Sequence, residues 1–240
     1  MIDVITFDLW NTIIDNKSYK NVRVKILQDS LTQKGLNINL NDIERTYEET
    51  FHRFSYNSEL NEHRHIYNRN RLENFFKSYN LDIFSLETKK LINTFESYML
   101  NDPPTLKEDA YEVLHELSKT YKIGLISDTG VTPGRIIKKM FQNYGVLKFF
   151  SATIFSDEVG YYKPNPIIFN IALKTIGGAA ENAVHIGDLL ETDIKGANDA
   201  GMHTVWIKNN YNAKKNEIKP DYIINNLSEL LSCIDQINKI

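Results

Sequence analysis

The sequence predicts an α/β protein in which a doubly wound, mostly parallel sheet is interrupted by an inserted all-helical domain. From residue 106 onwards, short apolar runs alternate with amphipathic helical patterns, and repeated βα units of this kind build parallel sheets. Between residues 16 and 102, by contrast, apolar side chains recur at the helical spacings of three and four. We therefore expect a core domain formed by residues 1–15 and 103–240, and a helical insertion over residues 16–102.

Length and composition limit the classes of function. A chain of 240 residues can hold a core with a smaller inserted domain, and 42% hydrophobic with 25% charged residues is typical of a packed soluble protein. The 28 Lys and Arg against 31 Asp and Glu argue against a nucleic-acid partner, and no stretch is apolar enough to suggest a membrane partner. With one cysteine, Cys233, and no signal-like start, we expect a cytoplasmic protein of unknown oligomeric state.

The first element is a buried strand, rich in β-branched and aromatic side chains, that ends at Asp8. Four helical patterns follow. The first ends at Gly35, a plausible C-cap, and Asn41 with Glu44 resembles a capping box for the second. A Pro-Pro pair then closes the insertion. The apolar faces of the four helices comprise Val24, Leu27 and Leu31; Ile43, Tyr47, Phe51 and Phe54; Ile66, Leu72, Phe76 and Tyr79; and Leu91, Phe95 and Met99.

The rest of the chain alternates between helix and strand. Helices are expected near residues 106–117, 133–144, 166–175, 192–200 and 228–237, and strands near residues 121–127, 150–155, 183–186, 203–207 and 222–224.

Four short groups of polar residues, which we call stations, follow the predicted strands or lie in the loops after them. They are Asp8, Ser127 in the run SDTG, Lys163, and Asp188 with Asp193. Each has an ordinary structural explanation: a turn for Ser127, a solvated lysine for Lys163, a helix cap for Asp193. Together they supply what Mg²⁺-assisted phosphoryl transfer needs, with Asp8 as the nucleophile that forms an aspartyl-phosphate.

In this interpretation Mg²⁺ bridges Asp8, the phosphoryl oxygen and Asp188, while Ser127 and Lys163 hold and neutralise the phosphoryl oxygens. The catalytic residues are then Asp8, Ser127 and Lys163, and the substrate is a small phosphorylated metabolite. The expected substrate- and phosphate-binding residues are Trp10, Asn11, Thr12, Ser127, Asp128 and Lys163.

The four stations, in this order, resemble the motifs of the haloacid dehalogenase superfamily. Asp8 with Thr12 is similar to the first motif, Ser127 to the second, Lys163 with Pro164 to the third, and Gly187-Asp188 with Asp193 to the fourth. The resemblance implies a Rossmann-like core, covalent aspartyl catalysis and usually Mg²⁺, held by Asp8, the backbone carbonyl of Trp10, Asp188 and Asp193. It also implies that the helical insertion is a C1-type cap, which closes over the site and selects the substrate.

One position departs from that pattern. Phosphatases of the superfamily carry a second aspartate two residues after the nucleophile, which protonates the leaving group and later activates water; here that residue is Trp10. Indole cannot exchange a proton near neutral pH, and loss of an acid/base group costs ~10²–10⁴ in rate.

Three functions therefore stay open. The first is a phosphatase that takes its acid/base group from elsewhere. The second is a 2-haloacid dehalogenase-like hydrolase that uses Asp8 without metal, although Asp188 and Asp193 preserve a metal station. The third is a catalytically weak phosphate-binding or regulatory protein.

The insertion offers polar candidates of its own. Arg64 and Arg71, seven residues apart, would share a helix face that could grip an anionic substrate, although a solvated polar face is the simpler explanation. His185 and His203 lie in or beside core strands and are expected to be structural. The candidates for a replacement acid/base are His52, Glu62, His63 and His65.

Overall fold

The computed structural model describes residues 1–52, 63–82, 86–208 and 218–239, and within them the core is a parallel six-stranded sheet. The strands are β1 (Val4–Phe7), β2 (Lys122–Ser127), β3 (Ala152–Phe155), β4 (Ala183–Gly187), β5 (His203–Ile207) and β6 (Tyr222–Ile224). Their order is β3-β2-β1-β4-β5-β6, which is the Rossmann order, and every pairing is parallel. The predicted fold class is confirmed.

The strand order reverses between β1 and β4, and this reversal positions the site. Phe7 of β1 pairs with Leu125 of β2 on one side and with Ile186 of β4 on the other. After β1 the next strands, β2 and β3, are added on one side of the sheet, whereas after β4 the next strands, β5 and β6, are added on the other side. Connections on opposite sides leave a crevice at the carboxyl ends of the two central strands, where ligands bind in open α/β sheets.

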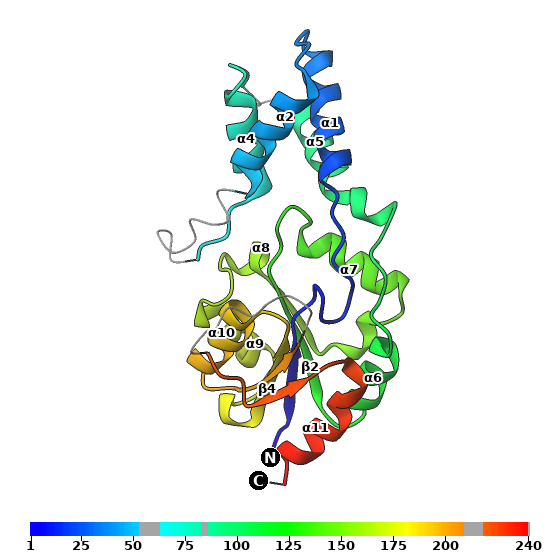
Figure 1. Ribbon diagram of the computed structural model, residues 1–240, viewed down its shortest axis with the longest axis vertical. Coiled ribbons are helices and arrows are strands. Elements are labelled where there is room, and N and C mark those ends of the chain that lie inside the picture. The colour runs from blue at the N-terminus through cyan, green and yellow to red at the C-terminus, as the bar shows by residue number, and fades with distance from the viewer. Residues whose placement is uncertain (53–62, 83–85, 209–217, 240) are drawn as a thin grey trace.

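Helices cover both faces of the sheet (Figure 1). One face packs against α6 (Ala110–Leu117), α7 (Gly134–Asn143) and α11 (Leu230–Ile237), and the other against α9 (Pro166–Ile176) and α10 (Lys195–Asp199). Shorter elements are α8 (Ser156–Val159) and the turns η3 (Leu147–Phe149), η4 (Ala180–Asn182), η5 (Leu190–Ile194) and η6 (Leu227–Glu229). The helix predicted from residue 106 starts only at Ala110, because Leu106 pairs with Ile14 in an isolated bridge.

Four helices gather beyond the carboxyl edge of the sheet, and together with their short extensions we call them the helical segment (described residues 20–52, 63–82 and 86–100; Figure 1). They are α1 (Lys20–Gln33), α2 (Leu40–Tyr47), α4 (Asn68–Lys77) and α5 (Leu86–Ser97), extended by η1 (Glu48–His52) and η2 (Tyr98–Leu100). The segment has an apolar cluster of its own, which includes Leu27, Phe76 and Phe95, whereas the predicted Phe54 lies outside the described residues. A separate cluster of this kind is what an inserted helical unit needs to pack.

Of the two helix ends predicted in the helical segment, the end of α1 is confirmed and the cap of α2 is wrong. Gly35 follows α1 with a φ of +82°, as a helix-ending glycine does. The cap of α2, however, is Asn39, whose side chain accepts a hydrogen bond from the backbone N–H of Asp42 at 3.0 Å, and not the predicted Asn41–Glu44 pair. Asn39 has the extended backbone of an N-cap residue and the helix starts at the next residue, Leu40. The cap therefore lies two residues before the predicted one.

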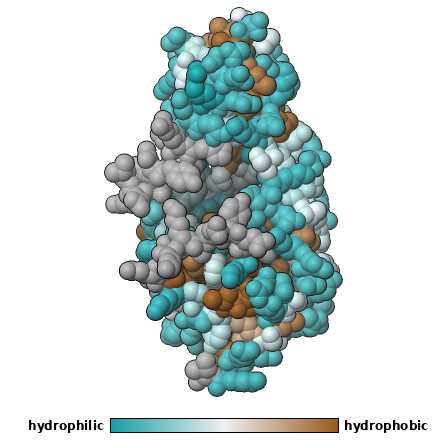
Figure 2. All heavy atoms as spheres, viewed as in Figure 1, coloured by the Kyte–Doolittle hydropathy of each residue, from teal (hydrophilic) through white to brown (hydrophobic). Residues whose placement is uncertain are grey.

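Polar contacts join the helical segment to the loop that follows β2. Arg23 of α1 donates to the Thr132 hydroxyl at 2.7 Å, and Asn68 of α4 donates to the carbonyl of Val131 at 2.7 Å. Within the described ranges, no helix has the length and apolar character to cross a membrane. The face drawn in Figure 2 is mainly hydrophilic over the helical segment, in keeping with the charged composition.

Candidate active site

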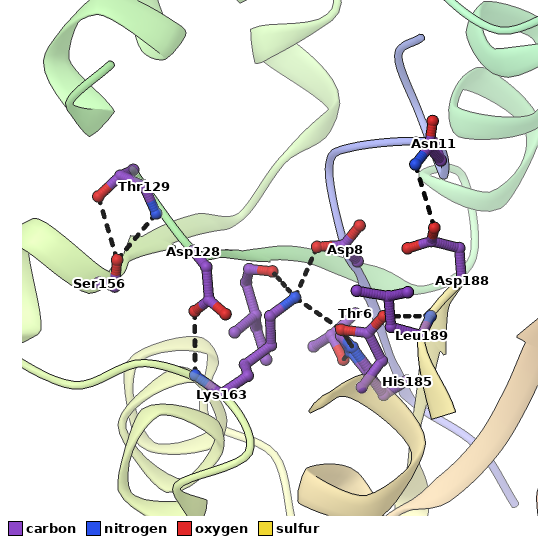
Figure 3. A network of polar contacts seen from close by, with 12 residues as sticks. Thr6, Asp8, Asn11, Asp128, Thr129, Ser156, Lys163, His185, Asp188 and Leu189 are labelled. Carbon is purple, nitrogen blue, oxygen red and sulfur yellow. Dashed lines mark hydrogen bonds and ion pairs between the residues drawn. The ribbon is translucent and has the colours of Figure 1, made fainter. Parts of the chain in front are cut away.

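Asp8 follows the last residue of β1, at the switch point of the sheet. Its backbone N–H donates to the carbonyl of Ile186 in β4 at 2.8 Å, which continues the parallel ladder by one residue and fixes where the side chain starts. The side chain is buried, with the residue 6% exposed, and its Oδ1 lies 2.5 Å from Nζ of Lys163. The first and third predicted stations therefore meet, as Figure 3 shows.

Lys163 is held by three acceptors. Its Nζ donates to Asp8 Oδ1 at 2.5 Å, to Asp193 Oδ1 at 2.7 Å and to the carbonyl of Ile126 at 3.2 Å. An ammonium group has three hydrogens, so these contacts fix its direction completely. The backbone N–H of Lys163 donates to Asp128 Oδ1 at 3.0 Å (Figure 3), which ties the lysine loop to the end of β2.

The charges around Lys163 keep it protonated. Burial opposes the ammonium charge, but the carboxylates of Asp193, Asp8 and Asp128 outweigh burial and raise the pKa of Lys163 above its ordinary value. Burial likewise opposes ionisation of Asp193, but Lys163 and His185 hold the pKa of Asp193 below its usual range. Lys163 is therefore a permanent cation and Asp193 a permanent anion near neutral pH.

The carboxylates around Lys163 carry more negative charge than its single ammonium group can balance. Their arrangement shows whether a divalent cation would fit among them. Burial raises the pKa of Asp8 to about 8; Lys163 acts against this, while Asp193 and Asp188 reinforce it. The ligand atoms of Asp8, Asp188 and Asp193 all lie within 4.8 Å of one another. Three buried carboxylates around one ammonium need further positive charge to stay ionised together, and carboxylate oxygens are the donors that Mg²⁺ prefers.

The three carboxylates are not equivalent. Asp193 uses both oxygens, since Oδ1 accepts from Lys163 and Oδ2 accepts from the backbone N–H of Leu189 at 2.9 Å. Asp188 accepts from the side-chain amide of Asn11 through one oxygen, at 3.2 Å. The ring of His185 is fully buried 3.8 Å from Asp193, beyond hydrogen-bond distance. Both carboxylate oxygens of Asp193 are thus engaged by hydrogen-bond donors of the protein.

A cavity of about 340 Å³ opens above Asp8. Most of the predicted site residues line it: Asp8, Trp10, Asn11, Asp128, Lys163, Asp188 and Asp193. Thr12 and Ser127 do not; they are 1% and 0% exposed, and their hydroxyls have no hydrogen-bond partner among the described residues. Buried hydroxyls normally find partners, so these two beside the cavity can still accept or donate.

The polar candidates in the insertion lie elsewhere. Arg64 precedes α4 and stacks over Tyr161 at 4.8 Å, so it shares no helix face with Arg71. Arg71 is 1% exposed and donates to the carbonyl of Ile66 at 3.1 Å, which excludes the solvated face considered for it.

None of the described acid/base candidates of the insertion lines the cavity. The carbonyl of His63 accepts from the N–H of Tyr162 at 2.6 Å, and His65 contacts the Ser156 hydroxyl at 3.1 Å. His52 ends η1, and Glu62 lies outside the described residues.

The helical segment instead contributes residues that sequence reasoning did not single out. Tyr19, which immediately precedes α1, and Arg23, in the first turn of α1, line the same cavity as Asp8. Arg23 is 7% exposed, and its guanidinium lies 5.4 Å from the centre of the Tyr19 ring. The only available signal was their closeness in sequence to Asp8, because the helical pattern of α1 marks its apolar face and not the residues beside it.

Fold and site together define an α/β enzyme with an acidic centre at the switch point of its sheet. The model of the haloacid dehalogenase-like hydrolases matches residues 2–201, and the chain therefore belongs to this family. It is a hydrolase, and the similar proteins described next support a phosphoric monoester hydrolase.

Similar proteins cover different shares of the chain. The glyceraldehyde 3-phosphate phosphatase of Pyrococcus furiosus is 30% identical over an alignment 244 positions long, gaps included, that covers 99% of this chain and 95% of that protein. The protein of the same name from Methanopyrus kandleri is 36% identical over 115 residues, 45% of this chain but only 49% of that protein. The crystal structure of a HAD phosphatase from Thermococcus onnurineus is 26% identical with a TM-score of 0.66, covering 97% of this chain and 98% of that one.

Proposed function

We propose that this protein is a Mg²⁺-dependent phosphatase that hydrolyses a small phosphorylated metabolite through an aspartyl-phosphate on Asp8. One observation carries the proposal: Asp8 shares Lys163 with a second carboxylate, Asp193, at the switch point of the sheet, inside a cavity. A nucleophile needs to be ionised and aimed. The contact at 2.5 Å with Lys163 aims Asp8 and favours its ionised form, and the divalent cation would supply the remaining positive charge that burial makes necessary.

In the first step Asp8 attacks phosphorus and the ester oxygen leaves. Lys163 neutralises charge on Asp8 before attack and on the phosphoryl oxygens as the bond forms. The hydroxyls of Thr12, in the turn after β1, and of Ser127, the last residue of β2, have no hydrogen-bond partner among the described residues and would be able to donate to those oxygens. In the second step water attacks phosphorus, and phosphate leaves with Asp8 regenerated.

We assign the cation to Asp8, Asp188 and the backbone carbonyl of Trp10. Both oxygens of Asp193 are engaged by the protein, so its proposed role is to orient Lys163 and to add negative charge near the cation. When bound, Mg²⁺ would supply the positive charge that reduces repulsion between Asp8 and an anionic substrate. Asn11, which donates to Asp188 at 3.2 Å, would hold that carboxylate in place.

The substrate is proposed to be about the size of a triose phosphate. A cavity of about 340 Å³ is near the lower end for ligand pockets, and two relatives are named for the three-carbon glyceraldehyde 3-phosphate. We propose that the helical segment, extended to the predicted 16–102, acts as a cap. Tyr19 and Arg23 would then contact the part of the substrate that does not react.

The test is turnover of a panel of small phosphate monoesters, including glyceraldehyde 3-phosphate, with and without Mg²⁺. Wild type should release phosphate, EDTA should stop it, and Mg²⁺ should restore it. Asp8→Asn should lose activity entirely while keeping a cooperative unfolding transition, because the amide is a poor nucleophile of nearly the same shape. Equal phosphate release by Asp8→Asn and wild type would refute the assignment of Asp8.

A second candidate is supported by Trp10, whose position next to the nucleophile lacks the phosphatase acid and which lines the cavity. A dehalogenase would displace halide from carbon with Asp8 and would need no cation. It predicts halide release from 2-haloacids in EDTA and no phosphate release. A flat phosphate panel combined with measurable binding of inorganic phosphate would instead favour the non-catalytic, phosphate-binding alternative.

A further inference from the structure

A phosphatase of this design needs a group that gives a proton to the leaving oxygen, and Trp10 cannot supply one. The cavity must therefore offer a substitute. Asp8, Asp188 and Asp193 are already engaged as nucleophile, cation ligand and partner of Lys163 in the proposed function, on which this inference rests. The question is which other ionisable residue around the cavity can exchange a proton.

Four of the described cavity residues are unsuited to that exchange. Lys163 keeps its proton because carboxylates surround it, and a guanidinium such as that of Arg23 does not lose its proton in proteins. Tyr19 donates its hydroxyl to the carbonyl of Asp102 at 2.7 Å, and burial raises its pKa to about 12. Lys17 forms an ion pair with the side chain of Asp102, on the link between core and helical segment.

Asp128 has the geometry for the task. It directly follows β2, it lines the same cavity as Asp8, and its Oδ1 is fixed by the backbone N–H of Lys163 at 3.0 Å. The carboxyl group is therefore oriented by the loop that also aims the catalytic lysine (Figure 3). Burial raises the pKa of Asp128 to about 6, with Lys163 acting in the opposite direction, so the protonated and ionised forms are both accessible near neutral pH.

The charge of the substrate also favours a protonated Asp128. An ionised carboxylate beside an incoming phosphoryl dianion would repel it, whereas the acid form can donate a hydrogen bond to an ester or phosphoryl oxygen. The phosphate-binding role expected for Asp128 from the sequence thus requires the proton that a general acid carries.

We propose that Asp128 is the general acid and base of this enzyme, in place of the aspartate that Trp10 replaces. The bond from Asp8 to phosphorus forms, the bond from phosphorus to the ester oxygen breaks, and the proton of Asp128 passes to that oxygen to release the alcohol. The Asp128 carboxylate then takes a proton from water as the hydroxide adds to phosphorus. Phosphate and Asp8 separate, and Asp128 is protonated again, so atoms and charge balance over the cycle.

The test compares two substrates in an Asp128→Asn variant, in which the amide oxygen can still accept from the N–H of Lys163. Glycerol phosphate has a poor leaving group and needs the acid, whereas p-nitrophenyl phosphate releases a stable anion and does not. We expect kcat/KM to fall ~10²–10⁴ for glycerol phosphate and little for p-nitrophenyl phosphate. Because the base for the second step is also missing, p-nitrophenyl phosphate should show a burst of nitrophenolate followed by slow turnover.

Asp157→Asn is the matched control. Asp157 also anchors a loop, accepting from the backbone N–H of Gly134 at 3.0 Å, but it does not line the cavity of Asp8. Any effect of Asp157→Asn should be equal for the two substrates. If Asp128→Asn likewise lowers kcat/KM equally for both substrates and gives no burst, Asp128 is only a loop anchor and the proposal is wrong.

A rescue experiment separates catalysis from folding. Adding Trp10→Asp to Asp128→Asn should restore kcat/KM for glycerol phosphate at least tenfold over the same double variant with Trp10→Asn. A purely structural role of Asp128 predicts no such difference and would overturn the proposal. Absence of turnover in wild type would refute the proposed function and this inference with it, whereas an active wild type with equal losses refutes the inference alone.

Discussion

The two walls of the cavity are built in different ways. On the core side, Asp8 and Asp188 follow two adjacent parallel strands, so the register of β1 and β4 alone brings them together. On the other side, Arg23 belongs to α1 and Tyr19 immediately precedes this helix, and a hydrogen bond from Arg23 to Thr132 ties the helix to the core. In the proposed function, sheet register therefore positions the reacting groups, whereas the packing of the helical segment on the core positions the residues around the rest of the substrate.

The largest effect on activity should come from a substitution on the core side of the cavity. Lys163→Gln removes the cation that Asp8 and Asp193 share, so we expect kcat to fall by at least ~10²–10³ and the free energy of unfolding by about 3–5 kcal/mol. Phosphatase assays and urea unfolding measure the two. Lys138→Gln, which removes an exposed lysine paired with Glu158 at 2.9 Å, should change neither appreciably. Activity within a few-fold of wild type in Lys163→Gln would contradict the account.

A smaller effect on activity is expected from substitutions where the helical segment borders the cavity. Arg23→Met removes a buried guanidinium that lines the cavity, and we expect KM to rise about tenfold with kcat nearly kept, because the contact that we propose for Arg23 is with the unreactive part of the substrate. Thr132→Val breaks the hydrogen bond at 2.7 Å but leaves the guanidinium, and so should raise KM less. A fall in kcat without a change in KM would instead place Arg23 with the reacting groups.

The smallest effect concerns pH and the junction of the two units. Burial lowers the pKa of His65, beside Ser156, to about 4, below the ordinary value of 6.5. The unfolded chain then binds a proton that the folded protein refuses, so stability falls as the pH drops from about 6.5 to about 4. Urea unfolding across this window should show a steeper loss for wild type than for His65→Asn. Parallel profiles would mean that His65 is not buried as a neutral ring.

The contrast between the core side and the helical side of the cavity also explains which features could be predicted from the sequence. Asp8 and Asp188 could be brought together in advance because they follow strands whose carboxyl ends meet at the same edge of a parallel sheet. Lys163 lies further along, in the loop between α8 and α9, and its motif rather than a strand end predicted its place. The Asn41 cap and the shared face of Arg64 and Arg71 were wrong, since helix starts depend on a turn that periodicity does not encode.

The opposite wall was not predictable from the pattern. Tyr19 and Arg23 acquire their place only when α1 packs over the loop after β2, and α8 and η5 are too short to show a period. Asp128 was named as a phosphate ligand, but the proton that this role requires depends on burial, which is a property of the folded protein.

The most direct test of the central claim is to trap the covalent intermediate. Wild type turning over a phosphate monoester is quenched in acid, digested, and the phosphorylated peptide identified by mass spectrometry. We predict phosphate on the peptide that contains Asp8, confined to that aspartate, and none in Asp8→Asn. Phosphate on another residue during active turnover would contradict the account.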